Sequence, residues 1–193
     1  MADMDEFLFI NNDTLKNYLS SKKFKNCDFI KYYWVLPTDN NLIYYDPRPL
    51  FERFRGPFIK SSIYKTMVKG NISKLIYHVH YPSFYPKNKK FCDNEGNIIS
   101  SRFINFKEQK LINTKRAFLL HFRFKSTEEF VKKIKRGYSN WHGNRTKQFL
   151  GEVIGFYFMI NKITLEKINY IERVLNINLL SYKRKFIREK TKH

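Results

Sequence analysis

Residues 116–136 read RAFLLHFRFKSTEEFVKKIKR, and this stretch contains the change from strand to helix that decides the fold class. Residues 116–122 form a short, mostly apolar run, which is typical of a buried strand. Ser126 and Glu129 then form a capping box, in which each side chain accepts a hydrogen bond from the other residue's backbone amide and a helix begins. The helix continues to Arg136, because its apolar residues share one face and its lysines lie on the other. We therefore predict a strand that leads into an amphipathic helix.

Strand signals precede this stretch and helix signals follow it. Runs rich in β-branched and aromatic residues predict strands at residues 28–36, 63–68 and 74–81. A short helix capped by Asn12 or Asp13 is expected before them, and Pro- and Asn-containing residues 82–96 predict a mobile surface loop. The last part of the chain predicts helices and then a basic tail, at residues 145–160, 164–176 and 183–192. Strands first and helices last favour an α/β or α+β fold with C-terminal helices.

The composition excludes several classes of protein. The 193 residues are 42% hydrophobic and 18% aromatic, which is enough apolar surface to offset the entropy of ordering, so intrinsic disorder is excluded. No apolar run reaches the roughly 18 residues that span a bilayer, and the acidic start does not resemble a signal peptide. Cys27 and Cys92 allow at most one disulfide and lack metal-ligand spacing, so a reducing compartment is the default. We expect a cytoplasmic protein, peripheral if it contacts a membrane.

The positive charge is concentrated in the second half of the chain. The sequence has 37 Lys and Arg against 17 Asp and Glu, a formal net charge of +20. Residues 1–100 hold 15 basic and 10 acidic side chains, and residues 101–193 hold 22 and 7. Such a surface attracts phosphate in nucleic acid, in a nucleotide-sugar or in anionic lipid headgroups. Charge alone does not choose among them, and a coding bias towards Lys and Asn is an alternative without functional meaning.

An acidic motif, DMDEF, occupies residues 3–7. In an extended segment the side chains of Asp3 and Asp5 point to the same side, with Cα atoms roughly 6.6 Å apart. They could bind one magnesium or manganese ion, which takes carboxylate oxygens as ligands and completes its shell from substrate phosphates. A solvated acidic terminus is the alternative interpretation.

The motif and the segments after it resemble, in order, elements of GT-A glycosyltransferases of family 92 and related family 2-like enzymes. DMDEF is similar to their DxDEF signature, and residues 121–137 are similar to their HY-x-x-KS-x-EEF-x-x-K-x-x-RG block. Between these lie shorter similarities at Tyr33-Trp34, Glu52-Arg53-Phe54, and Lys65 followed by His78 and His80. The resemblance covers about residues 3–142. It implies an α/β fold with an incomplete, Rossmann-like mixed sheet and C-terminal helices.

The resemblance also implies a substrate and a metal. The expected reaction transfers a sugar from a nucleotide-sugar donor to a glycan or lipid-linked saccharide acceptor. Asp3 and Asp5 would bind manganese or magnesium, with His121 as a third ligand or as a contact to the diphosphate. Lys65 and Lys125 would lie near the same phosphates. A histidine that only packs in the strand is the alternative for His121.

The catalytic base would be a carboxylate that accepts the proton of the acceptor hydroxyl. Asp39, Asp46 and Glu52 are the candidates, because they lie near the expected acceptor loop. Residues 36–40, LPTDN, stand where the resemblance implies a Phe- and Gly-containing loop, so the acceptor is not indicated.

The position of the motif suggests that part of the enzyme is missing. In the GT-A fold the DxD motif follows the units that bind the nucleotide, whereas only two residues precede Asp3 here. We therefore interpret residues 1–142 as the C-terminal portion of a GT-A domain and residues 143–193 as a helical extension with a basic tail.

Two alternatives to a working glycosyltransferase remain open. Aromatic residues among basic ones, such as Tyr138, Trp141 and Tyr157, are also found in nucleic-acid-binding modules, although we disfavour nucleic acid as a partner. An inactive, truncated remnant is the other. The basic tail after Tyr182 predicts either contact with an anionic membrane surface or a solvated helix end.

Overall fold

The computed structural model describes residues 5–70, 89–99, 113–136 and 147–190. The chain divides into two compact units, which we name the sheet unit (residues 1–36 and 59–122) and the helical unit (residues 37–58 and 123–193). The domain boundary expected after residue 142 lies outside the described residues and stays a prediction.

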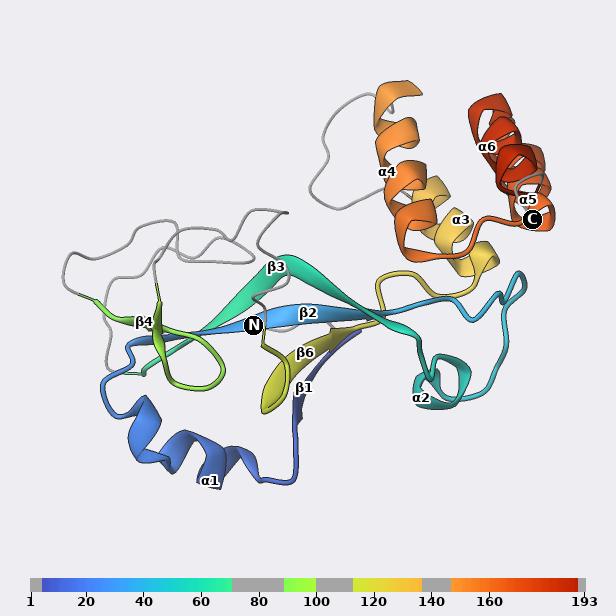
Figure 1. The fold of residues 1–193 in the computed structure, drawn as a ribbon. Coiled ribbons are helices and arrows are strands. Elements are labelled where there is room, and N and C mark those ends of the chain that lie inside the picture. The colour runs from blue at the N-terminus through green and yellow to red at the C-terminus, as the bar shows by residue number, and fades with distance from the viewer. Residues whose placement is uncertain (1–4, 71–88, 100–112, 137–146, 191–193) are drawn as a thin grey trace. The chain divides into compact units, whose positions relative to one another are not determined.

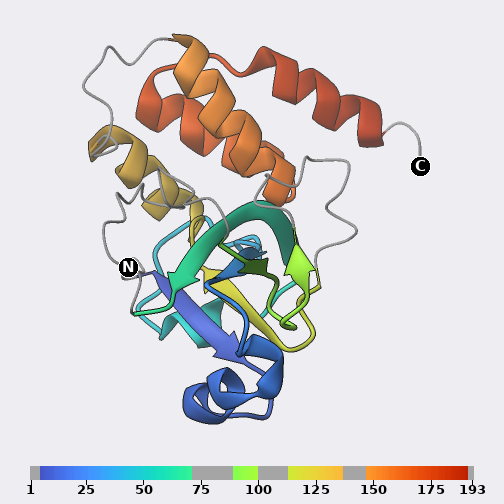
Figure 2. The ribbon, with the colours of Figure 1, turned by 90° about the vertical axis from the view of Figure 1, so that its left-hand side faces the viewer.

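A mixed sheet forms the sheet unit. Its order is β1 (Glu6–Ile10), β6 (Ala117–His121), β2 (Phe29–Pro37), β4 (Phe91–Cys92) and β5 (Ile98–Ile99), and β3 (Phe58–Val68) also pairs with β2. β2 runs parallel to β6 and to β4, whereas β1 with β6 and β4 with β5 are antiparallel. The strands lie side by side in Figure 1, and Figure 2 shows how strongly β3 bends. The predicted α/β class with a mixed sheet and C-terminal helices is confirmed, and the GT-A likeness stays a prediction.

β2 is the buried centre of this sheet. All nine of its residues are buried, and a strand covered on both faces reads as a continuous apolar run. The exception in that run is Lys31, whose ammonium lies 4.5 Å from the centroid of the Tyr64 ring. The strand predicted at residues 28–36 is therefore confirmed, whereas the strand predicted at residues 74–81 lies outside the described residues.

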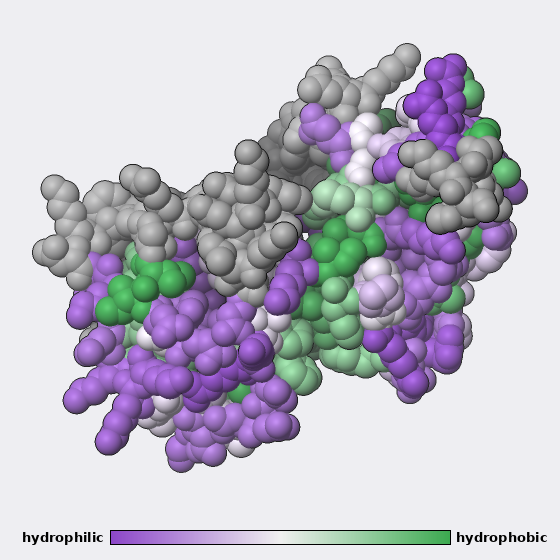
Figure 3. Space-filling model, in the orientation of Figure 1, coloured by the Kyte–Doolittle hydropathy of each residue, from purple (hydrophilic) through white to green (hydrophobic). Residues whose placement is uncertain are grey.

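The described helices of the helical unit are α2 (Leu50–Arg53), α3 (Thr127–Arg136), α4 (Lys147–Ile160), α5 (Leu165–Leu175) and α6 (Leu180–Lys190). α3 and α6 both contact α5, and Phe130 of α3 stacks on Tyr157 of α4 with ring centroids 4.1 Å apart. Figure 3 shows hydrophilic side chains over much of the visible surface. Within the described ranges, no helix is both long and apolar enough to cross a membrane.

Capping side chains mark the residues at which α3 and α1 begin. The Ser126 amide donates to Glu129 Oε2 at 3.1 Å and the Glu129 amide donates to Ser126 Oγ at 3.3 Å, so the predicted capping box is confirmed. The predicted cap of α1 (Leu15–Ser20) was wrong. Thr14 Oγ1, rather than Asn12 or Asp13, accepts the hydrogen bond from the backbone of α1.

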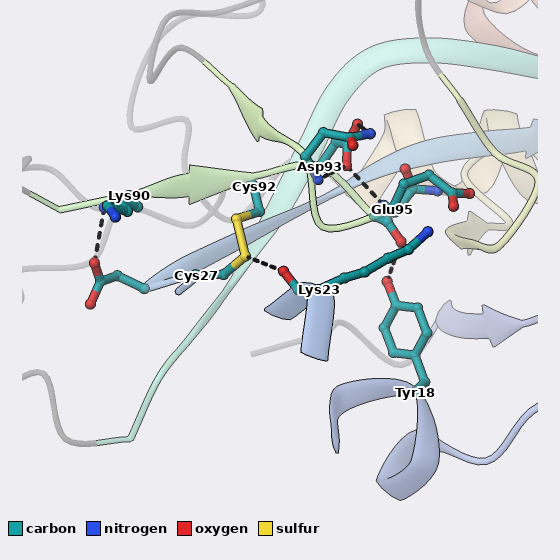
Figure 4. Close-up of a disulfide and its surroundings, with 10 residues drawn as sticks. Tyr18, Lys23, Cys27, Lys90, Cys92, Asp93 and Glu95 are labelled. Carbon is teal, nitrogen blue, oxygen red and sulfur yellow. Dashed lines mark hydrogen bonds between the residues drawn. A yellow bond between two sulfur atoms is a disulfide. The ribbon is translucent and has the colours of Figure 1, made fainter. Parts of the chain in front are cut away.

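A disulfide between Cys27 and Cys92 joins the start of β2 to β4 (Figure 4). Cys92 and Ile30 are partners in the parallel register, which brings the two cysteines together. Gly96, at φ +87°, lies so close to Lys23 that a Cβ would fall 2.7 Å from the Lys23 Cβ. The expectation of a mobile loop at residues 82–96 was therefore wrong for its described part, which is held by sheet pairing and a covalent bond. The disulfide also disagrees with the expectation of a reducing compartment, because disulfides persist in oxidising compartments.

Candidate active site

Strand pairing brings the acidic motif and His121 together in the sheet unit. Glu6, the first residue of β1, lies opposite His121, the last residue of β6, in the antiparallel register. The Phe122 amide donates to the Asp5 carbonyl at 2.9 Å and extends this pairing by one residue. Lys65 reaches the same place from β3. We name Asp5, Glu6, Lys65 and His121 the His121 cluster.

The His121 ring lies between two carboxylates. Its Nε2 is 3.6 Å from Asp5 Oδ1, and its Nδ1 is 3.8 Å from Glu6 Oε1. The Trp34 ring packs edge-on against the imidazole, with centroids 4.2 Å apart. The ring is therefore positioned on three sides by the sheet unit.

Charge and exposure differ within the His121 cluster. The Glu6 side chain is fully buried and its Oε2 lies 3.1 Å from Lys65 Nζ, so this carboxylate is neutralised inside the protein. The Asp5 side chain is 23% exposed, which leaves it accessible to a cation. With a neutral imidazole, the two carboxylates and one ammonium leave one negative charge. Such a cluster favours a bound cation.

The metal set expected from the sequence is only partly described. Asp5 and His121 lie together as expected, whereas Asp3, His78 and His80 lie outside the described residues. Within the described ranges, no group of three His, Cys, Asp or Glu side chains has the geometry to hold a metal. Lys125 is half-buried in the helical unit, so its expected place near the diphosphate stays a prediction.

Asp39 lies in a buried hydrogen-bond network of the helical unit. Its carboxylate accepts from Lys167 Nζ at 2.9 Å and from the Tyr157 hydroxyl, and its backbone amide donates to Asn161 Oδ1 at 2.6 Å. Burial raises the pKa of Tyr157 above its usual range and the Asp39 charge raises it further. Burial lowers the pKa of Lys167, and the Asp39 charge opposes that shift. At 1% exposed, Asp39 is the weakest of the three candidate bases, because a base must reach the acceptor hydroxyl.

Asp46 and Glu52 are both at the surface of the helical unit. Arg48 donates to both carboxylate oxygens of Asp46, from Nε to Oδ1 at 3.1 Å and from Nη2 to Oδ2 at 2.6 Å, and these hydrogen bonds lower the pKa of Asp46 to about 2. So acidic a group is a weak proton acceptor at neutral pH. Glu52 is exposed on α2, which makes its carboxylate the more accessible candidate.

Three residues of these networks were not assigned a role from the sequence. Glu6 was read only as part of the motif, although alternation along β1 places it on the inward side with Leu8 and Ile10. Tyr157 was considered only as an aromatic residue of the nucleic-acid-binding alternative, which its full burial does not favour. Lys167 gave no signal, because a lysine on an amphipathic helix is an ordinary feature. Only the packing of α4 and α5 around Asp39 gives these two residues their role.

Comparison of the chain with protein families, with curated proteins and with solved structures finds no match.

Proposed function

We propose that the protein is a glycosyltransferase that moves a sugar from a nucleotide-sugar donor to a glycan or lipid-linked saccharide. One observation supports this proposal above the others. Asp5, Lys65 and His121 come from three motifs that resemble GT-A elements in sequence order, and they meet in one cluster of the sheet unit. A chance resemblance would give no reason for these three segments to converge.

The donor atoms at the cluster suit a divalent metal. Asp5 offers a carboxylate that solvent can reach, and His121 offers an imidazole nitrogen 3.6 Å from it. Carboxylate and imidazole are both ligands of manganese, and magnesium takes the carboxylate. A bound ion of this kind would neutralise charge on the departing diphosphate.

The protein's own residues prepare this site in two ways. Glu6 Oε1 lies 3.8 Å from Nδ1 of His121, and a hydrogen bond formed there on metal binding would hold the tautomer whose Nε2 lone pair points towards Asp5. Lys65 neutralises Glu6, so the buried carboxylate does not compete for the cation. Of the three carboxylates considered as the base that takes the acceptor proton, Glu52 is the most accessible.

Titration of manganese followed by electron paramagnetic resonance tests the proposal, because free aqueous Mn²⁺ loses its signal when bound. We expect Asp5→Asn and His121→Ala each to weaken Mn²⁺ binding by about tenfold or more. Glu166→Gln removes an exposed carboxylate from α5 and serves as the matched control. Addition of UDP- or GDP-sugars should tighten Mn²⁺ binding in the unmodified protein. Equal Mn²⁺ affinity in all four proteins, with no effect of any nucleotide-sugar, would contradict the proposal.

A further inference from the structure

α6 has two faces of different character. Tyr182 packs against Phe158 of α4, with ring centroids 5.0 Å apart, and so marks the inward face. Leu180 and Ile187 are seven residues apart, about two helical turns, and therefore share a face. That face is roughly opposite Tyr182, and the two residues are 52% and 59% exposed. The outward face of α6 thus presents aliphatic side chains where a solvated helix presents polar ones.

Basic side chains flank this aliphatic pair. Residues 180–188 contain four basic residues and no acidic one. Arg184 and Arg188 are exposed on one side of the pair, and Lys183, on the other side, lies 2.6 Å from Glu172 of α5. Figure 3 shows strongly hydrophilic and strongly hydrophobic atoms next to one another over the α5 and α6 region. A cationic helix with an exposed aliphatic stripe is the pattern of helices that lie in a membrane interface.

The chemistry of this face discriminates among partners. Nucleic-acid surfaces stack bases on aromatic rings, but the exposed apolar side chains that the structure describes on α6 are aliphatic, Leu180 and Ile187. A second copy of the chain would bring the same cations face to face in a symmetric contact, which is repulsive. An anionic lipid surface satisfies both features, since its phosphates attract the cations and its acyl boundary accepts the aliphatic side chains.

We propose that α6 lies on anionic membranes, with Leu180 and Ile187 in the boundary between headgroups and acyl chains and with Arg184 and Arg188 at lipid phosphates. This inference does not rest on the proposed glycosyltransferase activity, because it concerns another surface and its test measures no turnover.

Co-sedimentation of the full chain with vesicles tests the docking. We expect pelleting with phosphatidylcholine vesicles that contain phosphatidylglycerol and little with phosphatidylcholine alone. Arg184→Gln with Arg188→Gln should lower the partition coefficient about 30-fold, since each cation near such a surface contributes about 1 kcal/mol. Leu180→Ser with Ile187→Ser should lower it about tenfold at unchanged charge.

A control double substitution distinguishes an effect of the cations on α6 from an effect of the net charge of the protein. Lys22→Gln with Lys25→Gln removes the same charge from exposed positions of the sheet unit, and we expect this variant to pellet nearly as well as the unmodified protein. The proposal is overturned if the two double-Gln variants lose binding equally, or if no variant differs from the unmodified protein. It is also overturned if Leu180→Ser with Ile187→Ser abolishes self-association in light scattering while vesicle binding is unchanged. Circular dichroism of each variant checks that α6 still folds.

Discussion

Lys167 Nζ lies 2.7 Å from Asp39 Oδ2, and both side chains are buried in the helical unit. The pair connects the loop after β2 with α5, and the Tyr157 hydroxyl from α4 joins it. Two charges removed from water are stable only when they remain together. The pair therefore sets the packing of that loop and the two helices.

Removing one member of this pair should be costly. Lys167→Met leaves the Asp39 carboxylate buried without its cation, and we expect the free energy of unfolding to fall by about 3–5 kcal/mol. Urea denaturation measures the change. Adding Asp39→Asn to Lys167→Met should recover part of the loss, because no net charge is then buried. A Lys167→Met protein as stable as the unmodified one would contradict this account.

Lys31 should make stability depend on pH in the alkaline range. Burial lowers the pKa of Lys31 to about 8, below the value of the unfolded chain. Between about pH 8 and the unfolded value of about 10.4, the unfolded state binds more protons, so stability rises with pH. Below pH 8 the cost of the buried charge is fully present.

Substitution of Lys31 isolates that contribution. The shift is equivalent to about 3 kcal/mol, and loss of the ammonium contacts with the Tyr64 and Phe91 rings offsets about 1 kcal/mol. Lys31→Met should therefore raise the free energy of unfolding by about 2 kcal/mol at pH 7. The difference between the two proteins should shrink as the pH rises from 8 to 10, and a constant difference would exclude burial of the charge as its cause.

The disulfide should stabilise the sheet unit by restricting the unfolded chain. Cys27 and Cys92 are 65 residues apart in sequence, and closing a loop of that length contributes about 4 kcal/mol in the chain-entropy estimate. Cys27→Ala with Cys92→Ala should lower the free energy of unfolding by about 2–4 kcal/mol. A dithiol reductant should shift the urea midpoint of the unmodified protein and leave that of the variant unchanged. Reductant-insensitive unfolding of the unmodified protein would mean that the bond does not form in solution.

Glu6 should act on metal binding through His121. Glu6→Gln removes the charge that faces Nδ1, and we expect Mn²⁺ affinity to fall about 10- to 100-fold while Asp5 and His121 are still present. Mn²⁺ resonance titration gives the affinity, and thermal unfolding reports the separate cost of leaving Lys65 without its carboxylate. Glu6→Gln with Lys65→Met serves as the control, because it removes that unpaired charge. Recovery of full Mn²⁺ affinity in the double variant would assign the loss to structure instead of to His121.

The sequence predicted a structural element correctly where the residues that produce the element lie close together in the chain. The capping box of Ser126 and Glu129 starts α3 at the predicted place, because both partners lie within one helical turn. Likewise, the β-branched and aromatic residues of segment 28–36 are enough to predict the strand β2, although not the burial of all nine of its residues. The cap of α1 shows the limit of this approach, since Asn12, Asp13 and Thr14 are all good caps and only backbone geometry selects Thr14.

The sequence by itself determined the class of the fold, the order of strands before helices, and the motifs that make up the candidate site. The tertiary structure decided which of those residues meet. The antiparallel register of β1 and β6 places Glu6 beside His121, and the parallel register of β2 and β4 joins Cys27 to Cys92. It also made Asp39 a partner of Lys167. Helix caps and strand propensity depend on neighbours along the chain, whereas strand burial, register and charge pairing depend on contacts between segments that are distant in sequence.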